Sequence, residues 1–298
     1  MHDIESYLVS EKRSLEPSLK QFNRWVREKL PSKFSEPIQY SLMAGGKRLR
    51  PILCVAAYQA CGASLCRDIY GLATSIEVIH SYSLMHDDLP CMDDADLRRG
   101  RVTPHRVFAE KDVTKAGVLL IPAASLWAVE TLEKWGLDDS IKQRIIKELN
   151  RAAGANGMVG GQYLDLLAEE EILTPEALEM LHKKKTGALL RAALTIGALA
   201  AGADREVSES LGTFGHMLGL AFQIKDDLLD VTASAEALGK VPSDRTHFKS
   251  TYVSLYGVKV ASQMALEMKD RALESIVQTG INDSRLIELA EYTVDRNK

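Results

Sequence analysis

Cysteine is scarce in this sequence, and its spacing excludes the common cysteine-based frameworks. No two cysteines form a Cys-x-x-Cys pair, and none has a flanking histidine at zinc spacing. Neither a zinc knuckle nor a disulfide scaffold is therefore expected. Reduced thiols of this kind indicate a cytoplasmic protein, which is the location that we predict. The cysteines are Cys54, Cys61, Cys66 and Cys91.

An excess of positive charge and long hydrophobic runs are also missing. With 37 Lys and Arg against 41 Asp and Glu, the net charge is −4, so the broad basic surface that nucleic-acid binding requires is not expected. The N-terminal segment MHDIESYLVSEKRSLEP alternates charged with apolar residues and does not resemble a secretory signal. The most apolar segment, residues 189–203, contains Arg191 and is shorter than the roughly 20 apolar residues that cross a bilayer. We predict a core helix there, no integral membrane segment and no nucleic-acid partner.

The alternation of Val, Ile and Thr that marks β-strands is missing as well. Long Ala- and Leu-rich stretches are instead separated mainly by Gly and Pro, which is typical of an all-α protein. No linker rich in Pro, Gly or Ser divides the 298 residues, so we expect a single domain over residues 1–298. The predicted helices cover residues 3–30, 51–60, 68–88, 112–134, 138–169, 175–203, 206–232, 250–278 and 283–296.

One local theme occurs twice, a helix that ends in clustered aspartates. The first cluster, HDDLPCMDDADLRRG, places Asp87 and Asp88 at a predicted helix C-terminus, with Asp93 shortly after. The helix dipole puts partial negative charge at that end, so the carboxylates lie at the unfavourable terminus. We therefore expect a positive group to compensate them.

The second cluster, QIKDDLLD, contains Asp226, Asp227 and Asp230. Asp226 and Asp230 are four residues apart and lie on one helix face, where like charges repel by a few tenths of a kcal/mol. Gln223 lies on that same face, three residues before Asp226. Again a compensating cation is expected.

The alternative is that both clusters are ordinary solvated acidic faces. Their surroundings favour a metal site, because apolar helices precede both clusters and cations follow them, Arg98-Arg99 after the first and Lys240 after the second. Sparse carboxylates mixed with cations suit Mg²⁺, which takes one or two protein oxygens together with substrate phosphates. A calcium loop is a poorer fit, since neither cluster has alternating oxygen ligands around a central Gly with a closing Glu.

A basic turn, GGKRLRP, lies upstream of the first cluster. It combines Lys47, Arg48 and Arg50 with Gly45 and Gly46, which allow the backbone to approach an anion closely. Such a loop that leads into a helix suits diphosphate, and it does not match the Walker pattern of ATP-binding loops.

Two further cationic turns, Arg98-Arg99-Gly100 and Lys185-Thr186-Gly187, complete the pattern. Together the motifs predict two kinds of anion site, one bridged to aspartates by metal and one held directly by Lys and Arg. Two diphosphate substrates are therefore expected.

These motifs resemble those of the trans-polyprenyl diphosphate synthases, most closely the bacterial-type farnesyl diphosphate synthases. The matching segments are GGKRLRP (45–51), IHSYSLMHDDLPCMDDADLRRG (79–100), GMVGGQYLDL (157–166), KTG (185–187), and FQIKDDLLD with GK (222–230, 239–240). The resemblance implies a single-domain bundle of antiparallel helices around a central cavity, usually in a homodimer. It also implies an enzyme that joins isoprenoid diphosphates head to tail.

The resemblance further implies roles for individual residues. Three Mg²⁺ ions would be bound by Asp87, Asp93 and Asp226, with support from Asp88, Asp227 and Asp230. The allylic diphosphate would be bound by Arg98, Lys185 and Lys240, and Lys249 matches a further family position. Isopentenyl diphosphate would be bound by Lys47, Arg50, His80 and Arg99 next to Gly46. Thr186 and Gln223 could direct oxygen dipoles at the allylic carbocation. For His80 and Tyr82 a purely structural role in helix packing is the alternative.

Product length is predicted from the residues before the first cluster. Tyr82 lies five residues before Asp87, about 7.5 Å along the helix, where its ring would form the cavity floor. The resemblance implies that an aromatic residue here stops elongation early and favours the fifteen-carbon farnesyl product. Ser83 is small and adds no block, so a geranylgeranyl diphosphate synthase is the alternative.

Three positions depart from the family pattern. Val118 stands after Gly117 where the family commonly has Asp, the segment VPSDRTHFKS after Lys240 is one residue short, and Val253 replaces a frequent proline. Such losses are the only support for a non-catalytic subunit of the family, since both aspartate clusters are intact. A terpene cyclase is the other alternative, but it would need no site for isopentenyl diphosphate.

Overall fold

The computed structural model describes residues 2–168, 172–238 and 250–296, and these form an all-α structure with one small hairpin. The predicted fold class is confirmed. The elements are α1 His2–Lys29, α2 Ser32–Leu42, α3 Leu49–Ala60, α4 Arg67–Asp87, β1 Leu97–Arg98, β2 Arg101–Val102, α5 Pro104–Val107, α6 Glu110–Trp135, α7 Asp139–Ala153, α8 Met158–Leu167, α9 Pro175–His182, η1 Lys183–Gly187, α10 Ala188–Ala200, α11 Arg205–Leu238, α12 Tyr252–Glu274 and α13 Ser284–Asp295.

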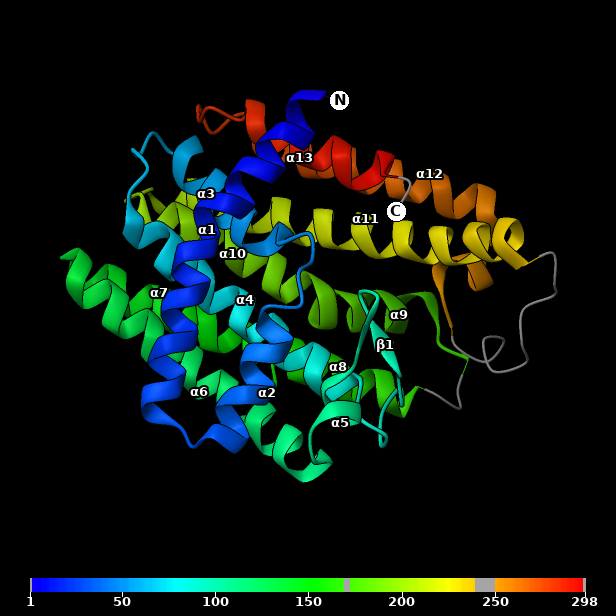
Figure 1. Cartoon of the computed structure of the whole chain (residues 1–298). Helices are drawn as coiled ribbons and strands as arrows, with labels where there is room; N and C mark the ends of the chain where they lie inside the picture. Colours follow the sequence, from blue (N-terminus) through cyan, green and yellow to red (C-terminus); the bar gives the residue numbers. More distant parts are fainter. Residues whose placement is uncertain (1, 169–171, 239–249, 297–298) are drawn as a thin grey trace.

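Helices α4 and α10 lie in the middle of the bundle (Figure 1). Helix α4 packs against α6, α3 and α1, and α10 packs against α3, α11 and α7. Helices α11, α12 and α13 run side by side along one edge of the molecule. Leu72, Ile76 and Ile79 of α4 are fully buried, so the helix that ends in the first aspartate cluster is fixed by the core along its length.

The N-terminal helix follows the predicted hydrophobic spacing. Every apolar residue of that pattern is buried on one face of α1: Ile4, Leu8, Leu15, Leu19, Phe22 and Val26. Helix α2 was not predicted, although Ile38 and Leu42 bury its inner face. It is short, and Pro31 and Pro37 mark a break rather than a helix in sequence.

Two predicted helices are interrupted. The predicted helix over residues 138–169 divides into α7 and α8 because the chain turns between Gly154 and Gly157; a Cβ on Gly157 would lie 2.1 Å from the Ala152 carbonyl oxygen. The predicted helix over residues 175–203 contains the π-helical turn η1. Such turns are rare and frequently lie at functional sites.

The hairpin β1–β2 was also not predicted. Leu97 pairs with Val102 and Arg98 with Arg101, which leaves a two-residue loop, Arg99-Gly100. Both loop residues have positive φ, 55° and 74°, as the tight turns that match the twist of a hairpin require. The hairpin holds two of the predicted cations at fixed positions beside the first aspartate cluster.

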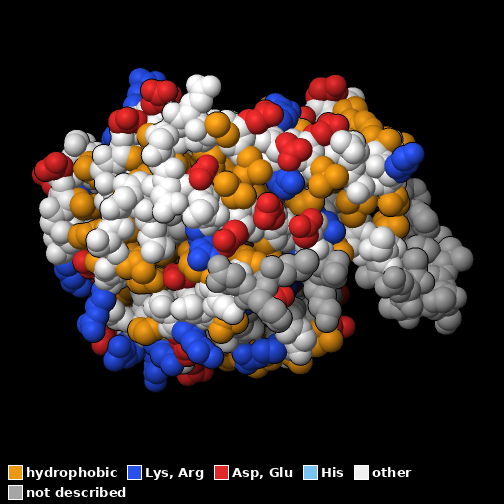
Figure 2. Space-filling model, turned by 90° about the horizontal axis from the view of Figure 1, so that it is seen from above, with side chains coloured by type: hydrophobic (Ala, Val, Ile, Leu, Met, Phe, Trp, Pro, Cys, Tyr) orange, Lys and Arg blue, Asp and Glu red, His pale blue; other side chains and the backbone are white. Residues whose placement is uncertain are grey.

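Among the described helices, α6 is long and apolar enough to cross a membrane by length and composition alone. The segment 189–203, singled out in sequence, does not pass that test. The inner face of α6, with Val113, Ala124 and Trp127, is buried in the hydrophobic core. Over the described part of the face seen in Figure 2, acidic, basic and hydrophobic side chains are interspersed.

Candidate active site

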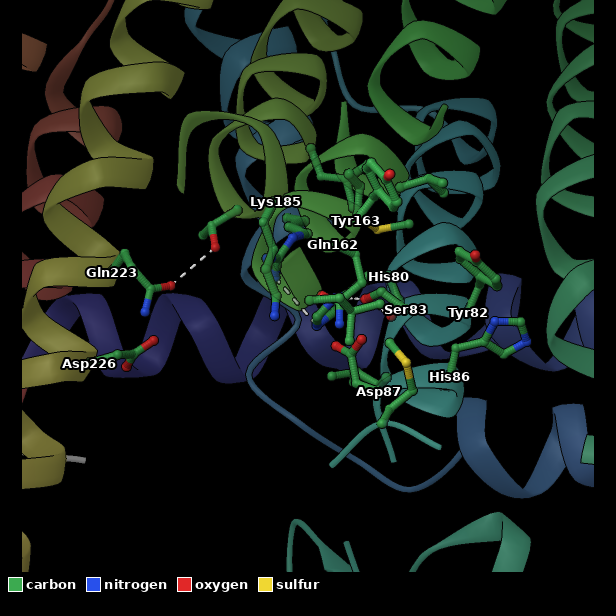
Figure 3. A pocket seen from close by; sticks show the side chains of 18 of the residues that line it. His80, Tyr82, Ser83, His86, Asp87, Gln162, Tyr163, Lys185, Gln223 and Asp226 are labelled. Carbon is green, nitrogen blue, oxygen red and sulfur yellow. Dashed lines mark hydrogen bonds between the residues drawn. The ribbon is translucent and has the colours of Figure 1, made fainter. Parts of the chain in front are cut away.

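A cavity of about 410 Å³ opens among α4, α8, η1, α10 and α11 (Figure 3). Its size is within the usual range of small-molecule sites. The cavity brings together nine of the residues predicted from sequence, which come from four separate segments: Arg50, His80, Tyr82, Ser83, Asp87, Lys185, Thr186, Gln223 and Asp226.

Asp87, the last residue of α4, is the member of the first cluster that lines the cavity. Burial raises the pKa of its carboxyl to about 6, and the nearby charges of Asp93 and Asp88 add to the rise, whereas Lys185 and Arg98 oppose it. Asp93 is exposed, and its backbone N–H donates to the Asp87 carbonyl at 2.9 Å. Asp87 is therefore a half-buried carboxyl whose ionised form is disfavoured mainly by its burial.

Asp88 does not line the cavity. Its buried carboxylate accepts two hydrogen bonds from Arg98, from Nε at 2.8 Å and from Nη2 at 2.6 Å. This charge-assisted pair joins the end of α4 to the hairpin. In this structure Asp88 positions Arg98 beside the cavity.

The second cluster divides in the same way. Asp226 lines the cavity and accepts a hydrogen bond from Arg296 near the C-terminus at 2.5 Å. Asp227 points instead toward α12, where it accepts from the Tyr252 backbone N–H at 2.9 Å and from Gln223 at 3.1 Å. Burial nevertheless raises the pKa of Asp227 to about 6.

Asp230 is exposed as a whole residue. Partial burial of its carboxyl group, together with the nearby charge of Asp226, raises its pKa. Lys240 and Lys249, the remaining predicted ligands of diphosphate, lie outside the described residues.

The turn η1 places Lys185 and Thr186 at the cavity wall. Lys185 Nζ donates to Asp165 Oδ2 at 2.6 Å. The Thr186 hydroxyl donates to Gln223 Oε1 at 3.1 Å (Figure 3). Helix α8 packs tightly on this turn, since a Cβ on Gly161 would lie 2.2 Å from the backbone nitrogen of Lys185. These contacts fix an ammonium group and a hydroxyl group on the same wall.

A second wall is basic. Arg50 is half-buried, and its Nη1 lies 3.3 Å from His80 Nε2. Burial, together with Arg50 and Arg99, lowers the pKa of His80 well below its usual value. His80 is therefore neutral, and its Nε2 accepts from Arg50. Arg50 Nε is buried without a hydrogen-bond partner among the described residues, which suits a site that receives an anion.

Gly46 lies beside the Arg99 side chain. The Arg99 guanidinium lies against it and donates to the Gly45 carbonyl; a Cβ on Gly46 would lie 2.3 Å from that group. The absence of a side chain at Gly46 thus makes room for Arg99. Lys47 lies near the same cluster, where burial and Arg296 lower its pKa while Asp226 raises it.

The far end of the cavity is closed by aromatic rings. Tyr82 packs on His86 with ring centroids 4.6 Å apart, and His86 Nε2 donates to the Thr114 carbonyl of α6 at 3.0 Å. A Cβ on Gly117 would lie 2.3 Å from His86 Nε2. Close packing of α6 therefore holds the His86 ring, and the His86 ring in turn holds Tyr82 (Figure 3).

Comparison with known proteins decides the family. The model of the polyprenyl synthetase family matches residues 31–289. The chain belongs to the polyprenyl synthetase family. It is 42% identical to the farnesyl diphosphate synthase of Bacillus subtilis over 260 residues, which cover 87% of this chain and 86% of the relative. It is 38% identical to geranylgeranyl pyrophosphate synthase 12 of Arabidopsis thaliana over 303 residues, with 99% and 82% covered. The solved geranyltransferase of Legionella pneumophila superposes with a TM-score of 0.84 at 29% identity, with 99% and 98% covered.

Two departures from the family pattern lie away from the cavity. Val118 is 57% exposed on the outer face of α6, so the polar group that it replaces would not line this cavity. Val253 is the second residue of α12, which starts without a proline because Thr251 and Ser254 form a capping box. The shortened segment after Lys240 lies outside the described residues except for Ser250.

Several lining residues were missed from the sequence. Met158, Val159, Gln162 and Leu166 come from α8, and Phe222 comes from α11. The segment GMVGGQYLDL was recognised as a family match, but no side chain in it was assigned a role. Lys12 of α1 was missed too, and burial, Arg48 and Arg99 lower its pKa. Lys12 therefore lies close enough to Arg48 and Arg99 to feel their charge, although it does not line the cavity.

The donor set fits Mg²⁺. Across residues 2–168, 172–238 and 250–296, no three His, Cys, Asp or Glu side chains converge closely enough to hold a metal by themselves. Asp87 and Asp226 reach the cavity from different helices, and burial is the main cause of the raised pKa of Asp87, so a cation bound there would stabilise its ionised form. Mg²⁺ binds in this way, through one or two carboxylates with water and phosphate oxygens completing its shell.

Arg48 of the basic turn GGKRLRP does not line the cavity, contrary to the expectation that the whole turn faces an anion. Its guanidinium is buried away from the cavity, where it pairs with Glu77 and donates to the Leu42 carbonyl at 2.5 Å. The positive φ of Arg48, 55°, directs it inward while Arg50 lines the cavity. Arg48 is therefore a structural cation and not part of the diphosphate site.

Removing Arg48 should be costly, because Glu77 would remain buried without its partner. We expect Arg48→Met to lower the free energy of unfolding by about 3–5 kcal/mol, measured by urea titration. In the double variant Arg48→Met/Glu77→Leu no buried charge is left unpaired, so most of that loss should be recovered. Equal losses in the single and double variants would show that the pair is not the cause.

Proposed function

We propose that this prenyltransferase condenses isopentenyl diphosphate with dimethylallyl and then geranyl diphosphate to give farnesyl diphosphate. The observation that carries the proposal is one cavity with carboxylates from two helices, a basic wall and an aromatic end. Family membership supports the reaction class, and farnesyl diphosphate synthases are among the relatives. Enzymes of this family generally depend on Mg²⁺.

The allylic substrate would bind where Asp87 and Asp226 face the cavity. We infer that these residues hold Mg²⁺, up to three ions, with Asp93 and Asp230 nearby and Asp88 and Asp227 in support. The metal supplies positive charge to the oxygens of the leaving diphosphate. Lys185, on the wall beside Asp87, adds a direct cationic contact, and Arg98 is positioned by Asp88 to do the same.

Isopentenyl diphosphate would bind at the basic wall. Arg50 offers an unpartnered Nε donor there, and Lys47 and Arg99 add charge close by. His80 is neutral and accepts from Arg50, which keeps the guanidinium oriented without adding a further cation. This wall argues against a terpene cyclase, which needs no second diphosphate.

The reacting carbons would meet between these two sites. The allylic C–O bond breaks, the isopentenyl double bond forms the new C–C bond, and the released diphosphate takes the proton. Thr186 and Gln223 can orient oxygen lone pairs toward the developing carbocation, because their hydrogen bond fixes both groups at the wall. Apolar side chains such as Met158 and Phe222 keep water from the cation.

In this proposal Tyr82 sets the length of the prenyl product. Its ring lines the cavity end and is held by His86, so a chain that grows from Asp87 meets it. A geranylgeranyl product is the second candidate, because Ser83 is small and a relative is named a geranylgeranyl pyrophosphate synthase. A non-catalytic subunit is disfavoured, since Asp87 and Asp226 both line the cavity.

A cytoplasmic homodimer built from one domain per chain is also proposed. Val118 and Leu126 are 57% and 56% exposed on the outer face of α6, eight residues apart on one side of the helix. Such an apolar stripe is suited to pair with a second copy.

The function is tested by incubating the purified protein with isopentenyl diphosphate and either primer. We expect Mg²⁺-dependent formation of farnesyl diphosphate with release of inorganic diphosphate, read by chromatography. Geranyl diphosphate should serve as a primer as well as dimethylallyl diphosphate does, because it is the intermediate of the same reaction. No elongated product from either primer would refute the proposal.

A further inference from the structure

A second cavity of about 400 Å³ lies on the other side of η1. Lys183 and Lys184 of η1 line it, together with Arg151 of α7, Arg191 of α10 and His216 of α11. None of these residues lines the active-site cavity. The same π-helical turn therefore presents two lysines to this cavity and Lys185 to the other.

A thin backbone wall separates the two cavities. Gly187 at the end of η1 packs on Gly219 of α11, where an added Cβ would lie 2.8 Å from the Gly187 Cα. His216 and Gln223 lie on either side of this contact, seven residues apart on α11 and thus about 10 Å apart along its axis. The second cavity is close to the active site but distinct from it.

The second cavity carries surplus positive charge. Among the described residues, ion pairs join three of its four cations to two carboxylates: Glu148 pairs with Arg191 and, at 3.4 Å, with Arg151. Glu179 pairs with Lys183 at 2.5 Å. Lys184 has no ion-pair partner in the part of the chain that the structure describes. About two positive charges are therefore left uncompensated in a protein whose net charge is −4.

His216 adds an unsatisfied polar atom. Its Nδ1 is buried and has no hydrogen-bond partner among the described residues. Burial and the charges of Arg191, Lys183 and Arg151 lower the pKa of His216 to about 4. A neutral imidazole here can donate one hydrogen bond to a ligand, and leaving it unmade is unfavourable.

We infer that this second cavity binds a small phosphate-bearing anion of the diphosphate class. The surplus positive charge suits an anion that carries two or more negative charges, and Lys184 and Arg151 are placed to contact its oxygens with His216 as a further donor. Met180, Ala152 and Ala188 complete the lining, so an organic group on the phosphate would meet apolar contacts. This site goes beyond the proposed function, because its occupancy requires no turnover and no aspartate cluster.

Histidine side-chain NMR tests the inference, because His216 reports on this cavity and His80 on the active site. The protein is titrated with inorganic diphosphate in EDTA, and the His216 signal is assigned by its loss in His216→Asn. We expect a saturable shift of His216. In Arg151→Ala/Lys184→Ala, the diphosphate concentration that gives half of the maximal His216 shift should rise at least tenfold. In Arg50→Gln that concentration should be unchanged, whereas the shift of the His80 signal should weaken.

A single variant guards against misfolding of the double one. Lys184→Gln removes no ion pair among the described residues, and it should still weaken the His216 titration at least threefold. A second titration with isopentenyl diphosphate identifies the source: tighter binding than inorganic diphosphate indicates an organic diphosphate, and equal binding indicates the inorganic anion. Absence of a saturable His216 shift with both probes, or a titration unchanged in the double variant, would overturn the inference.

Discussion

Asp87→Asn should reduce kcat/KM for condensation by roughly 10²–10³-fold. The amide cannot hold Mg²⁺ as the carboxylate does, so stabilisation of the leaving diphosphate is lost at the reacting bond. The concentration of Mg²⁺ that gives half-maximal activity should rise at the same time. Both quantities come from steady-state assays at a series of Mg²⁺ concentrations.

The same substitution should stabilise the metal-free protein. The pKa of Asp87 rises from 3.8 to about 6 on folding, so the folded state holds this proton more tightly than the unfolded chain. Stability from this group is fully present below pH 4 and is lost as the pH rises toward 6. Asn carries no charge. In EDTA we expect the free energy of unfolding of Asp87→Asn to exceed that of the parent by roughly 2–3 kcal/mol above pH 6. Near pH 4 the two free energies should be equal.

Asp94→Asn is the matched control for both measurements. Asp94 lies in the same acidic segment but is exposed, pairs with Arg106 at 3.0 Å and does not line the cavity. Its replacement should leave kcat/KM within about twofold, because no contact to the cavity is lost. Equal losses of activity in the two variants would contradict the special position of Asp87.

Tyr82→Ala should lengthen the products. The ring closes the end of the cavity against His86, and its removal opens space in the direction in which the prenyl chain grows. We expect products of twenty carbons or more to become the major fraction, where the parent gives mainly fifteen-carbon product. Product distribution is measured by chromatography after equal turnover, so that a less stable variant does not bias the comparison.

Tyr82→Phe is the control for that result. It keeps the ring and its packing on His86 while it removes only the hydroxyl, so its product length should equal that of the parent. If Tyr82→Ala makes no longer products than Tyr82→Phe, the ring does not set the chain length.

Helix spacing predicted which segments carry the site, but not which side chain of each pair lines it. Adjacent residues on a helix point about 100° apart. Asp226 consequently faces the cavity, while Asp227 accepts a hydrogen bond from the Tyr252 backbone N–H at the start of α12. The acidic pairs and Arg98 were visible in sequence. The pairing of Arg98 with Asp88, and the partners Arg296 and Tyr252 of the second cluster, depend on tertiary packing.

Local backbone conformation explains the other differences. Arg48 and Arg50 look equivalent in GGKRLRP, but the left-handed conformation of Arg48 sends it to Glu77. The π-turn at Lys183–Gly187 has no marker in an Ala- and Leu-rich stretch, and it decides that Lys185 and Lys184 line different cavities. Neither feature follows from hydrophobic periodicity.

A crystal structure with Mg²⁺ and inorganic diphosphate tests the central claim most directly. The account predicts metal-bound oxygens from both Asp87 and Asp226, with diphosphate between them and Lys185 in contact with it. Asp226 should then have exchanged its contact with Arg296 for the metal. Diphosphate and metal bound away from both aspartates, with the pair of Asp226 and Arg296 intact, would contradict it.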